Sequence, residues 1–139
     1  MIHKLVSGGQ TGADIAALDV ALRYNFPHGG WCPKGRLSLD GQIPAKYLLT
    51  ETPSSGYPQR TEWNVRDSDG AVVFTFSKQP TGGSLKTINL CKKHGKPCLH
   101  ISRAAGTYEN PVIGVSPFGL IILIDWLGRL GFSGEWRGR

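Results

Sequence analysis

Two glycine pairs, each placed between an apolar run and a helical segment, constrain the fold of this chain most strongly. Gly8-Gly9 follows the apolar run that ends at Val6, and Gly82-Gly83 follows the run that ends at Phe76. In open parallel sheets, turns of this kind lie at the carboxyl ends of the strands and lead into the next helix. We therefore expect an α/β domain in which both glycine-rich turns lie at the ligand-binding end of a mainly parallel sheet.

The rest of the chain alternates between short apolar runs and helical segments, which is typical of a sheet flanked by helices. No internal repeat or low-complexity linker interrupts this pattern, so we expect residues 1–139 to form a single domain. Strands are predicted at His3–Val6, His28–Trp31, Tyr47–Glu51, Ala71–Phe76 and Pro97–Ile101. Helices are predicted at Ala13–Tyr24, Pro58–Asp67, Ser84–His94 and Phe118–Leu130, and a loop at Cys32–Gly41.

Three segments carry more detailed expectations. Ala71–Phe76 is continuous, apolar and β-favouring, which predicts a central strand buried on both faces. Trp63 is expected on the inner face of its helix. Phe118–Leu130 is apolar nearly all round, so the predicted helix is buried or faces another subunit. Its most apolar part, Leu120–Leu127, contains Asp125 and is far too short to span a bilayer.

The charge distribution favours an anionic partner. The formal net charge is +6, and no acidic residue lies between Asp69 and Glu109. A basic surface attracts phosphates, anionic cofactors or nucleic acid, although a solvated lysine-rich helix end explains the same pattern. The basic residues Lys92, Lys93 and Lys96 have neither interleaved aromatic residues nor a helix–turn–helix pattern beside them. We therefore do not expect nucleic-acid binding.

The cysteines favour a reducing compartment. Cys32, Cys91 and Cys98 are odd in number, and the N-terminus shows no basic and apolar leader, so we expect a cytoplasmic protein. Cys91 and Cys98 lie too far apart for a paired zinc knuckle, and no histidine pair completes one. No metal held by protein ligands is expected.

The two glycine-rich turns are candidates for anion binding. Glycine lets the backbone approach an anion, while the free amides and the dipole of the following helix attract negative charge. Neither turn matches the dinucleotide or P-loop fingerprint, so a packing role for the glycines stays open. Asp14 either compensates the helix dipole or orients a ribose or a bound metal. The predicted binding residues here are Gly8, Gly9, Gln10, Thr11, Gly12, Asp14, Thr81, Gly82, Gly83 and Ser84.

A second candidate group is the loop that carries Trp31, Lys34 and Arg36. A stacking ring beside two cations is suited to a flat ring and its phosphate, whereas a surface loop with Trp31 in the core is the alternative. The same cations would lower the pKa of the Cys32 thiol. Because no base is evident beside Cys32, we do not expect it to act as a nucleophile.

The third candidate group contains Glu51, Arg60 and Asn64. Arg60 and Asn64 are four residues apart and share one helix face, although capping and surface pairing would also explain residues near a helix start. Glu51, at a predicted strand end, is the best-placed carboxylate for general-base chemistry. No partner acid is evident for it, so no catalytic residue is assigned.

Several long motifs make the chain similar to a known family. They are Ser7–Asp14 (SGGQTGAD), Ala16–Asp19, Pro27–Arg36 (PHGGWCPKGR), Asp40–Pro44, Leu49–Thr52, Gln59–Asp69 (QRTEWNVRDSD) and Thr81–Gly83. Over roughly residues 2–101 the chain resembles the family called "putative molybdenum carrier proteins". That family is grouped in the SLOG superfamily with lonely-guy-type phosphoribohydrolases and DNA-processing protein A.

The resemblance implies a three-layer, Rossmann-like fold and a nucleotide-like ligand. The family name implies molybdenum cofactor, a pterin whose own dithiolene sulfurs hold the metal, so a carrier need only grip the pterin and its phosphate. The leading hypothesis is therefore a binding protein for a phosphate-bearing cofactor or nucleotide rather than an enzyme. After Leu130 the family continues into a strand that residues 132–139 do not match, so we expect an uncovered sheet edge, closed by another subunit in a dimer or tetramer.

The alternative is an enzyme, a nucleotide N-glycosidic hydrolase of the lonely-guy type. Those enzymes resemble Pro-Gly-Gly-x-Gly-Thr-x-x-Glu at the second turn. In this chain Leu85 stands in place of the third glycine and Asn89 in place of the acid. The loss of a carboxylate that would stabilise a developing ribosyl cation counts against hydrolysis.

Overall fold

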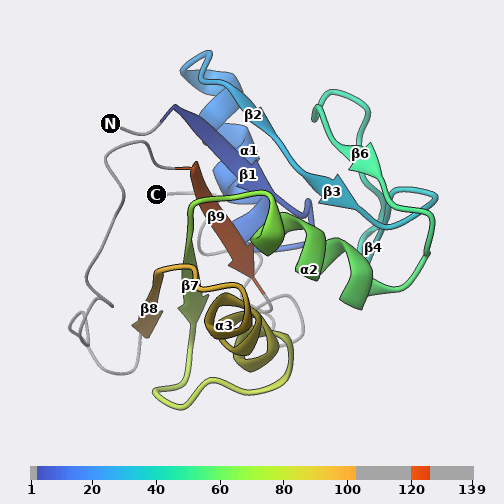
Figure 1. Cartoon of the computed structure of the whole chain (residues 1–139). Helices are drawn as coiled ribbons and strands as arrows, with labels where there is room; N and C mark the ends of the chain where they lie inside the picture. The colour runs from blue at the N-terminus through green and yellow to red at the C-terminus, as the bar shows by residue number, and fades with distance from the viewer. Residues whose placement is uncertain (1–2, 103–119, 126–139) are drawn as a thin grey trace.

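The computed structural model describes residues 3–102 and 120–125. Its core is a five-stranded sheet with the strand order β2-β1-β9-β7-β8, and every neighbouring pair in it is parallel (Figure 1). The strands are β1 (Lys4–Ser7), β2 (His28–Gly29), β7 (Gly70–Thr75), β8 (Cys98–Ser102) and β9 (Leu120–Asp125).

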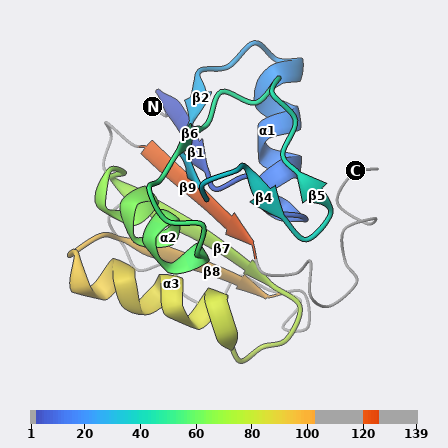
Figure 2. The same ribbon diagram turned by 90° about the vertical axis from the view of Figure 1, so that its right-hand side faces the viewer.

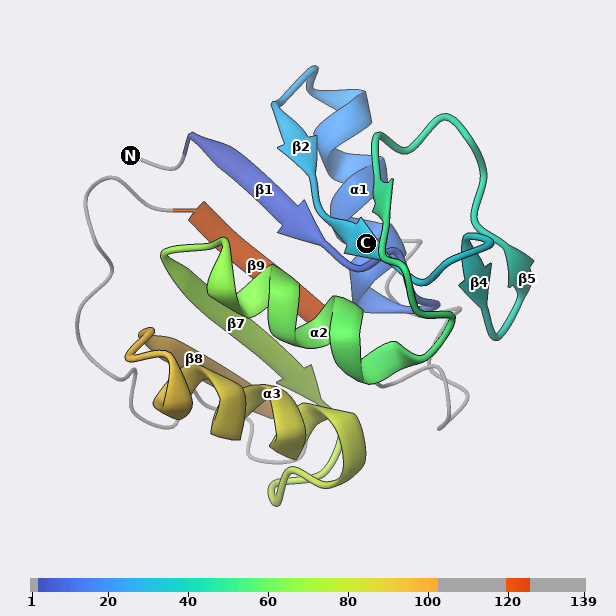
Figure 3. The ribbon, with the colours of Figure 1, turned by 45° about the vertical axis from the view of Figure 1, so that its right-hand side comes forward.

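Helices cover both faces of this sheet. The helix α1 (Ala13–Arg23) lies on one face, while α2 (Tyr57–Arg66) and α3 (Gly82–Lys93) lie on the other (Figures 2 and 3). The expected three-layer α/β architecture with a parallel sheet is therefore confirmed. For these three helices the predicted limits differ from the observed ones by no more than two residues. Gly95, with a φ of +63°, follows α3 in the left-handed conformation that glycine favours.

Four short strands lie beside the main sheet. The strands β3 (Trp31–Cys32) and β6 (Thr50–Glu51) form a parallel pair, and β4 (Leu37–Ser38) pairs with β5 (Gly41–Gln42) in a hairpin. The segment Cys32–Gly41, expected to be one loop, thus includes the last residue of β3, all of β4 and the first residue of β5. Ile43 and Tyr47, which lie between β5 and β6 in the sequence, are buried in one cluster with Leu18 of α1. This packing fixes the segment beside the carboxyl ends of the sheet.

The six residues from Leu120 to Asp125 form a strand, so the helix predicted across them is wrong there. Strand β9 lies between β1 and β7, pairing Ser7 with Leu123 and Val73 with Ile124. A short continuous apolar run suits a buried helix and a central parallel strand equally, because both are surrounded by apolar neighbours. Residues 118–119 and 126–130 of the predicted helix, and the family strand expected to be missing after them, fall outside the described residues.

Two smaller expectations also change. Burial along β7 alternates, with Ala71, Val73 and Thr75 buried and the residues between them only partly so. The buried face packs against α2 and α3, whereas α1, on the other side of the sheet, lies over β1 and β9. On α2, the fully buried residues include Val65 and Asn64, whereas Trp63 is only partly buried. Among the described helices none is long and apolar enough to cross a membrane.

Candidate functional site

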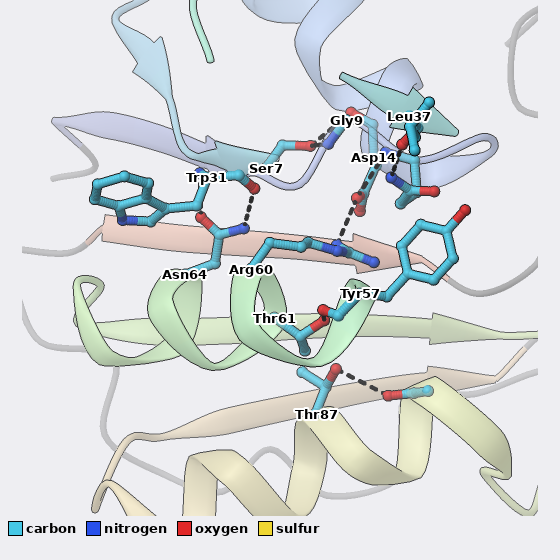
Figure 4. Close-up of polar contacts among 12 residues, drawn as sticks. Ser7, Gly9, Asp14, Trp31, Leu37, Tyr57, Arg60, Thr61, Asn64 and Thr87 are labelled. Atoms are coloured by element: carbon cyan, nitrogen blue, oxygen red, sulfur yellow. Dashed lines mark hydrogen bonds and ion pairs between the residues drawn. The ribbon is translucent and has the colours of Figure 1, made fainter. Parts of the chain in front are cut away.

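A buried polar cluster lies where the carboxyl end of β1 meets the start of α1 and the first turns of α2. It joins the glycine turn after Ser7, the carboxylate of Asp14 and the guanidinium of Arg60 (Figure 4). Ser7, Asp14 and Arg60 have no exposed surface. The site is therefore enclosed by the fold and differs from an open cradle of backbone amides.

The first glycine turn uses its amides internally. The Gly9 amide donates to Ser7 Oγ (3.2 Å), and the Gln10 amide donates to Asp14 Oδ2 (3.1 Å). The Gln10 side chain donates from Nε2 to the carbonyl of Leu37 (2.9 Å). The expectation that this turn presents free amides is thus wrong for these two residues, because side chains within the motif satisfy them.

Gly8 has a different use, which is to make room for Arg60. A Cβ placed on Gly8 would lie 2.0 Å from Arg60 Nη1 and 3.0 Å from Asp14 Oδ2. The guanidinium therefore lies directly against the backbone of the turn. Any larger residue at this position would have to displace it.

Arg60 is the least satisfied polar group among the described residues. Its Nη1 lies 3.5 Å from Asp14 Oδ2, and none of its three nitrogens has a hydrogen-bond partner within the described part of the chain. Burial lowers the pKa of the Arg60 guanidinium, while the negative charge of Asp14 acts in the opposite direction. Arginine stays charged in proteins, so the fold holds a buried cation with unused N–H donors.

Such an arrangement calls for an explanation, because burying a charged donor without hydrogen bonds costs several kcal/mol. That cost is comparable to the net free energy of unfolding of a whole domain. An oxyanion can accept two parallel hydrogen bonds from one guanidinium. Thr11, in the same glycine turn, also has a buried hydroxyl without a hydrogen-bond partner among the described residues. The Arg60 guanidinium thus has the donors that a phosphate or carboxylate group would need.

Asn64 and Trp31 occupy the opposite end of α2. Asn64 Oδ1 accepts from the Trp31 amide (2.7 Å), and its Nδ2 donates to the Trp31 carbonyl (2.9 Å). The Trp31 ring meets Trp63 edge to face at 4.8 Å, and its Nε1 donates to Asp67 (2.8 Å). Asn64 therefore ties β3 to α2, and the indole lies away from Arg60 (Figure 4).

The Arg36 guanidinium donates its hydrogen bonds to the loop after β5. It donates to the carbonyls of Ile43 (3.0 Å), Pro44 (2.8 Å), Tyr47 (2.9 Å) and Leu49 (3.2 Å). Lys34 and Glu51 are exposed beside it, and the Glu51 carboxylate accepts from the Gly35 amide. The structure therefore does not bring Lys34, Arg36 or Glu51 into contact with the Arg60 cluster.

Replacing Arg36 with alanine should lower the free energy of unfolding by about 2–4 kcal/mol, because several carbonyls lose a charged donor at once. Urea denaturation followed by circular dichroism measures this loss. The matched control is Lys34→Ala, which removes an exposed neighbouring cation and should change stability very little. Equal losses in the two variants would contradict the structural role of Arg36.

Cys32 belongs to the core, packed with Ile15, Leu18 and Ile43. Burial raises the pKa of its thiol, and this outweighs the opposing effect of Arg36. The expected lowering of that pKa is therefore wrong. Arg36 does favour the thiolate, but the loss of contact with water disfavours it more.

The Cys32 thiol should consequently resist alkylation in the folded protein. At pH 7.5 we expect iodoacetamide to modify it at least ~100-fold more slowly than in urea, because a buried thiol with a raised pKa offers little thiolate. Peptide mass spectrometry quantifies the modification at each cysteine. Rapid labelling of Cys32 in the native protein would show that the thiol is accessible to solvent and would contradict this prediction.

The second glycine turn leads into α3 at the carboxyl end of β7. Thr81 and Gly82 are exposed, Gly83 and Ser84 are buried, and the Gly83 carbonyl accepts from Thr87 Oγ1 (2.9 Å). The ion pair and the ring contact of Arg60 involve α1 and α2 only. The buried cluster is thus built around the first turn, and joint use of both turns stays a prediction.

Sequence reasoning missed two residues of the cluster. Ser7 Oγ accepts from Gly9 and donates to the Asp14 carbonyl (3.0 Å), which closes the turn on itself. The Tyr57 ring centroid lies 5.8 Å from Arg60 Cζ. Helical spacing could have found the second, because Tyr57 precedes Arg60 by three residues and shares its face of α2.

Comparisons with known proteins agree with the motifs. The model of the family described as "Circularly permutated YpsA SLOG family" matches residues 5–127. A solved structure, titled as a putative molybdenum carrier protein from Syntrophus aciditrophicus SB, is 36% identical and superposes with a TM-score of 0.80, covering 98% of this chain and 90% of that one. No curated protein matches. The family resemblance expected from the sequence is thereby confirmed.

Proposed function

Because the chain belongs to the circularly permutated YpsA SLOG family, we propose that it binds a phosphate-bearing nucleotide or cofactor at the Arg60 cluster. The observation that carries this proposal is the fully buried Arg60 guanidinium, which has an ion pair with Asp14 but no hydrogen bond among the described residues. A ligand phosphate would supply the missing acceptors. The three free, buried cysteines support a cytoplasmic setting.

Molybdopterin is one ligand consistent with this chemistry. The similar protein from Syntrophus is titled a "putative molybdenum carrier protein", and molybdopterin carries a phosphate that Arg60 could hold. The described residues contain no cluster of histidine, cysteine and carboxylate groups that could ligate the metal directly. In this proposal the protein holds the phosphate, and the cofactor's own sulfurs hold the metal. The homo-oligomer expected from the sequence stays a prediction.

Titration calorimetry with adenosine 5′-monophosphate, with adenosine as the matched control, tests the proposal. We expect heat of binding and a raised melting temperature only with the phosphate-bearing compound, because a ligand that binds the folded state stabilises it. Equal binding of adenosine, or no binding of any phosphate-bearing probe, would overturn the proposal.

Chromatography of the same samples addresses the hydrolase alternative. We expect the monophosphate to remain intact, since Asn89 stands where a hydrolase of the lonely-guy type has its acid. Release of free adenine would make the protein an enzyme.

A further inference from the structure

The Arg60 cluster carries little net charge for a site that binds an anion. Arg60 Nη1 lies 3.5 Å from Asp14 Oδ2, and both side chains are fully buried (Figure 4). The same carboxylate oxygen accepts from the Gln10 amide (3.1 Å). A carboxylate that accepts from an amide and pairs with a guanidinium carries a negative charge. The cation that would receive a phosphate therefore has a fixed anion as its neighbour.

Asp14 also offsets the positive end of α1. It is the second residue of that helix and lies in its first turn. A helix N-terminus carries the equivalent of about half a positive charge, which an acid in the first turn compensates. The guanidinium, the helix terminus and the carboxylate together leave only about half a positive charge.

No second cation makes up the difference within residues 3–102 and 120–125. Three titratable groups act on the charge of the guanidinium, namely Asp14 of α1, Tyr57 of α2 and Cys32 of β3, and all three are acidic groups. Arg36 acts on Cys32 as well, but its N–H groups donate to carbonyls of the loop after β5. A phosphate at the cluster would therefore meet one guanidinium that is already paired.

The enclosure of the cluster penalises a second negative charge on the ligand. The cost of removing an ion from water grows with the square of its charge, whereas its attraction to a fixed charge grows only in proportion. A phosphate monoester carries two negative charges above its second pKa of about 6 and one below it. A phosphodiester carries one. Beside a nearly neutral buried pair, the second charge costs more than it gains.

We propose that the Arg60 cluster selects phosphate groups that carry a single negative charge, either a phosphodiester or a monoester that keeps one proton. The Asp14 carboxylate is the specificity-determining group, because it cancels most of the positive charge that a dianion would need. The proposal rests on the proposed function, since it takes Arg60 as the group that binds the phosphate. It adds the charge state of the ligand.

Phosphorus NMR of adenosine 5′-monophosphate tests the proposal, because the chemical shift of the phosphorus reports the ionisation of the phosphate. Spectra are recorded from pH 5.5 to 7.5 with the full chain in excess. We expect the free compound to titrate at about 6, and the pKa of the bound phosphate to be higher by more than about 1, which means that the monoanion binds at least ~10-fold tighter than the dianion. A smaller rise, or a fall, overturns the proposal.

Asp14→Asn tests whether the carboxylate is the cause. The amide oxygen of asparagine can still accept from the Gln10 amide, but the negative charge is gone, so the rise in the pKa of the bound phosphate should be lost. The matched control is Asp19→Asn on the same helix, whose carboxylate accepts from the Tyr47 hydroxyl, and the rise should persist there. A rise that persists in folded Asp14→Asn overturns the role of Asp14.

The methyl ester of adenosine 5′-monophosphate provides a test on the wild type, which is decisive if Asp14→Asn does not fold. In titration calorimetry the affinity for the ester should stay within about twofold between pH 5.5 and 7.5, because its charge does not change. The affinity for the monophosphate should fall by about 25-fold, which is the loss of monoanion expected from a second pKa of about 6. An equal fall for both compounds would place the titrating proton on the protein and overturn the proposal.

These measurements separate the two proposals. If the monophosphate binds equally well at both pH values, the proposed function stands and the selection by charge fails. If neither compound binds the wild type at either pH, the proposed function fails, and the selection by charge fails with it.

Discussion

Replacing Arg60 with methionine is expected to weaken binding of adenosine 5′-monophosphate by about a hundredfold or more, which corresponds to about 2.7 kcal/mol. Methionine fills a similar volume without charge or donors, so the phosphate would lose its charge-assisted hydrogen bonds. Titration calorimetry measures the change. The matched control is Arg66→Met on the same helix, where the replaced side chain is 45% exposed and pairs with Asp67 outside the cluster. Affinity in that variant should stay within about twofold of the wild type, as is usual for an exposed charge away from the site.

The loss in Arg60→Met must be separated from a loss of stability. Removing Arg60 leaves Asp14 buried without its cation, and breaking a buried pair costs about 3–5 kcal/mol. The double variant Arg60→Met with Asp14→Asn removes both charges, and its amide oxygen can still accept from the Gln10 amide. We expect this variant to recover stability without recovering binding. Binding that returns with stability would mean that Arg60 is a structural residue only.

Gly30→Ala should lower the free energy of unfolding by more than about 4 kcal/mol, enough to leave little folded protein. Gly30 has a φ of +140°, and a Cβ there would lie 2.1 Å from the Ser7 carbonyl oxygen and 2.9 Å from the Ser7 nitrogen. Both obstacles are backbone atoms of β1, which cannot turn aside as a side chain can. Urea denaturation monitored by tryptophan fluorescence measures the loss.

Gly41→Ala separates the clash at Gly30 from backbone strain alone. Gly41 also has a positive φ, of +105°, but a Cβ there would meet no atom within 4 Å. Strain of this kind costs about 1–3 kcal/mol, so this variant should fold. Similar losses at Gly30 and Gly41 would show that the close approach between the β2–β3 connection and Ser7 is not what fixes glycine at position 30.

The parts of the fold that follow from local pattern were predicted from sequence. Apolar residues at Ile15, Leu18 and Leu22 predict α1, and the glycine pairs correctly mark both strand-to-helix turns. The run from Leu120 to Asp125 was assigned to the wrong element because its apolar character reports burial and not conformation. Only its pairing with both β1 and β7 decides that it is a strand.

The sequence predicted which residues belong to the candidate site better than it predicted what each of them does. Arg36 and Arg60 lie in equally distinctive motifs, so the sequence alone predicts a binding role for both. Tertiary contacts separate them: Arg36 donates to several carbonyls, whereas Arg60 lies beneath Gly8 without a hydrogen bond among the described residues. Likewise, Gly8 was expected to admit a ligand to the backbone, but the structure uses its missing side chain to admit Arg60.

A crystal structure of the protein with adenosine 5′-monophosphate bound locates the anion directly. We expect a phosphate oxygen about 3 Å from the guanidinium nitrogens of Arg60, the distance of a charge-assisted hydrogen bond. A phosphate held instead by the amides of Thr81–Ser84, with Arg60 still enclosed beneath Gly8, would contradict the assignment of the buried guanidinium as the anion-binding group.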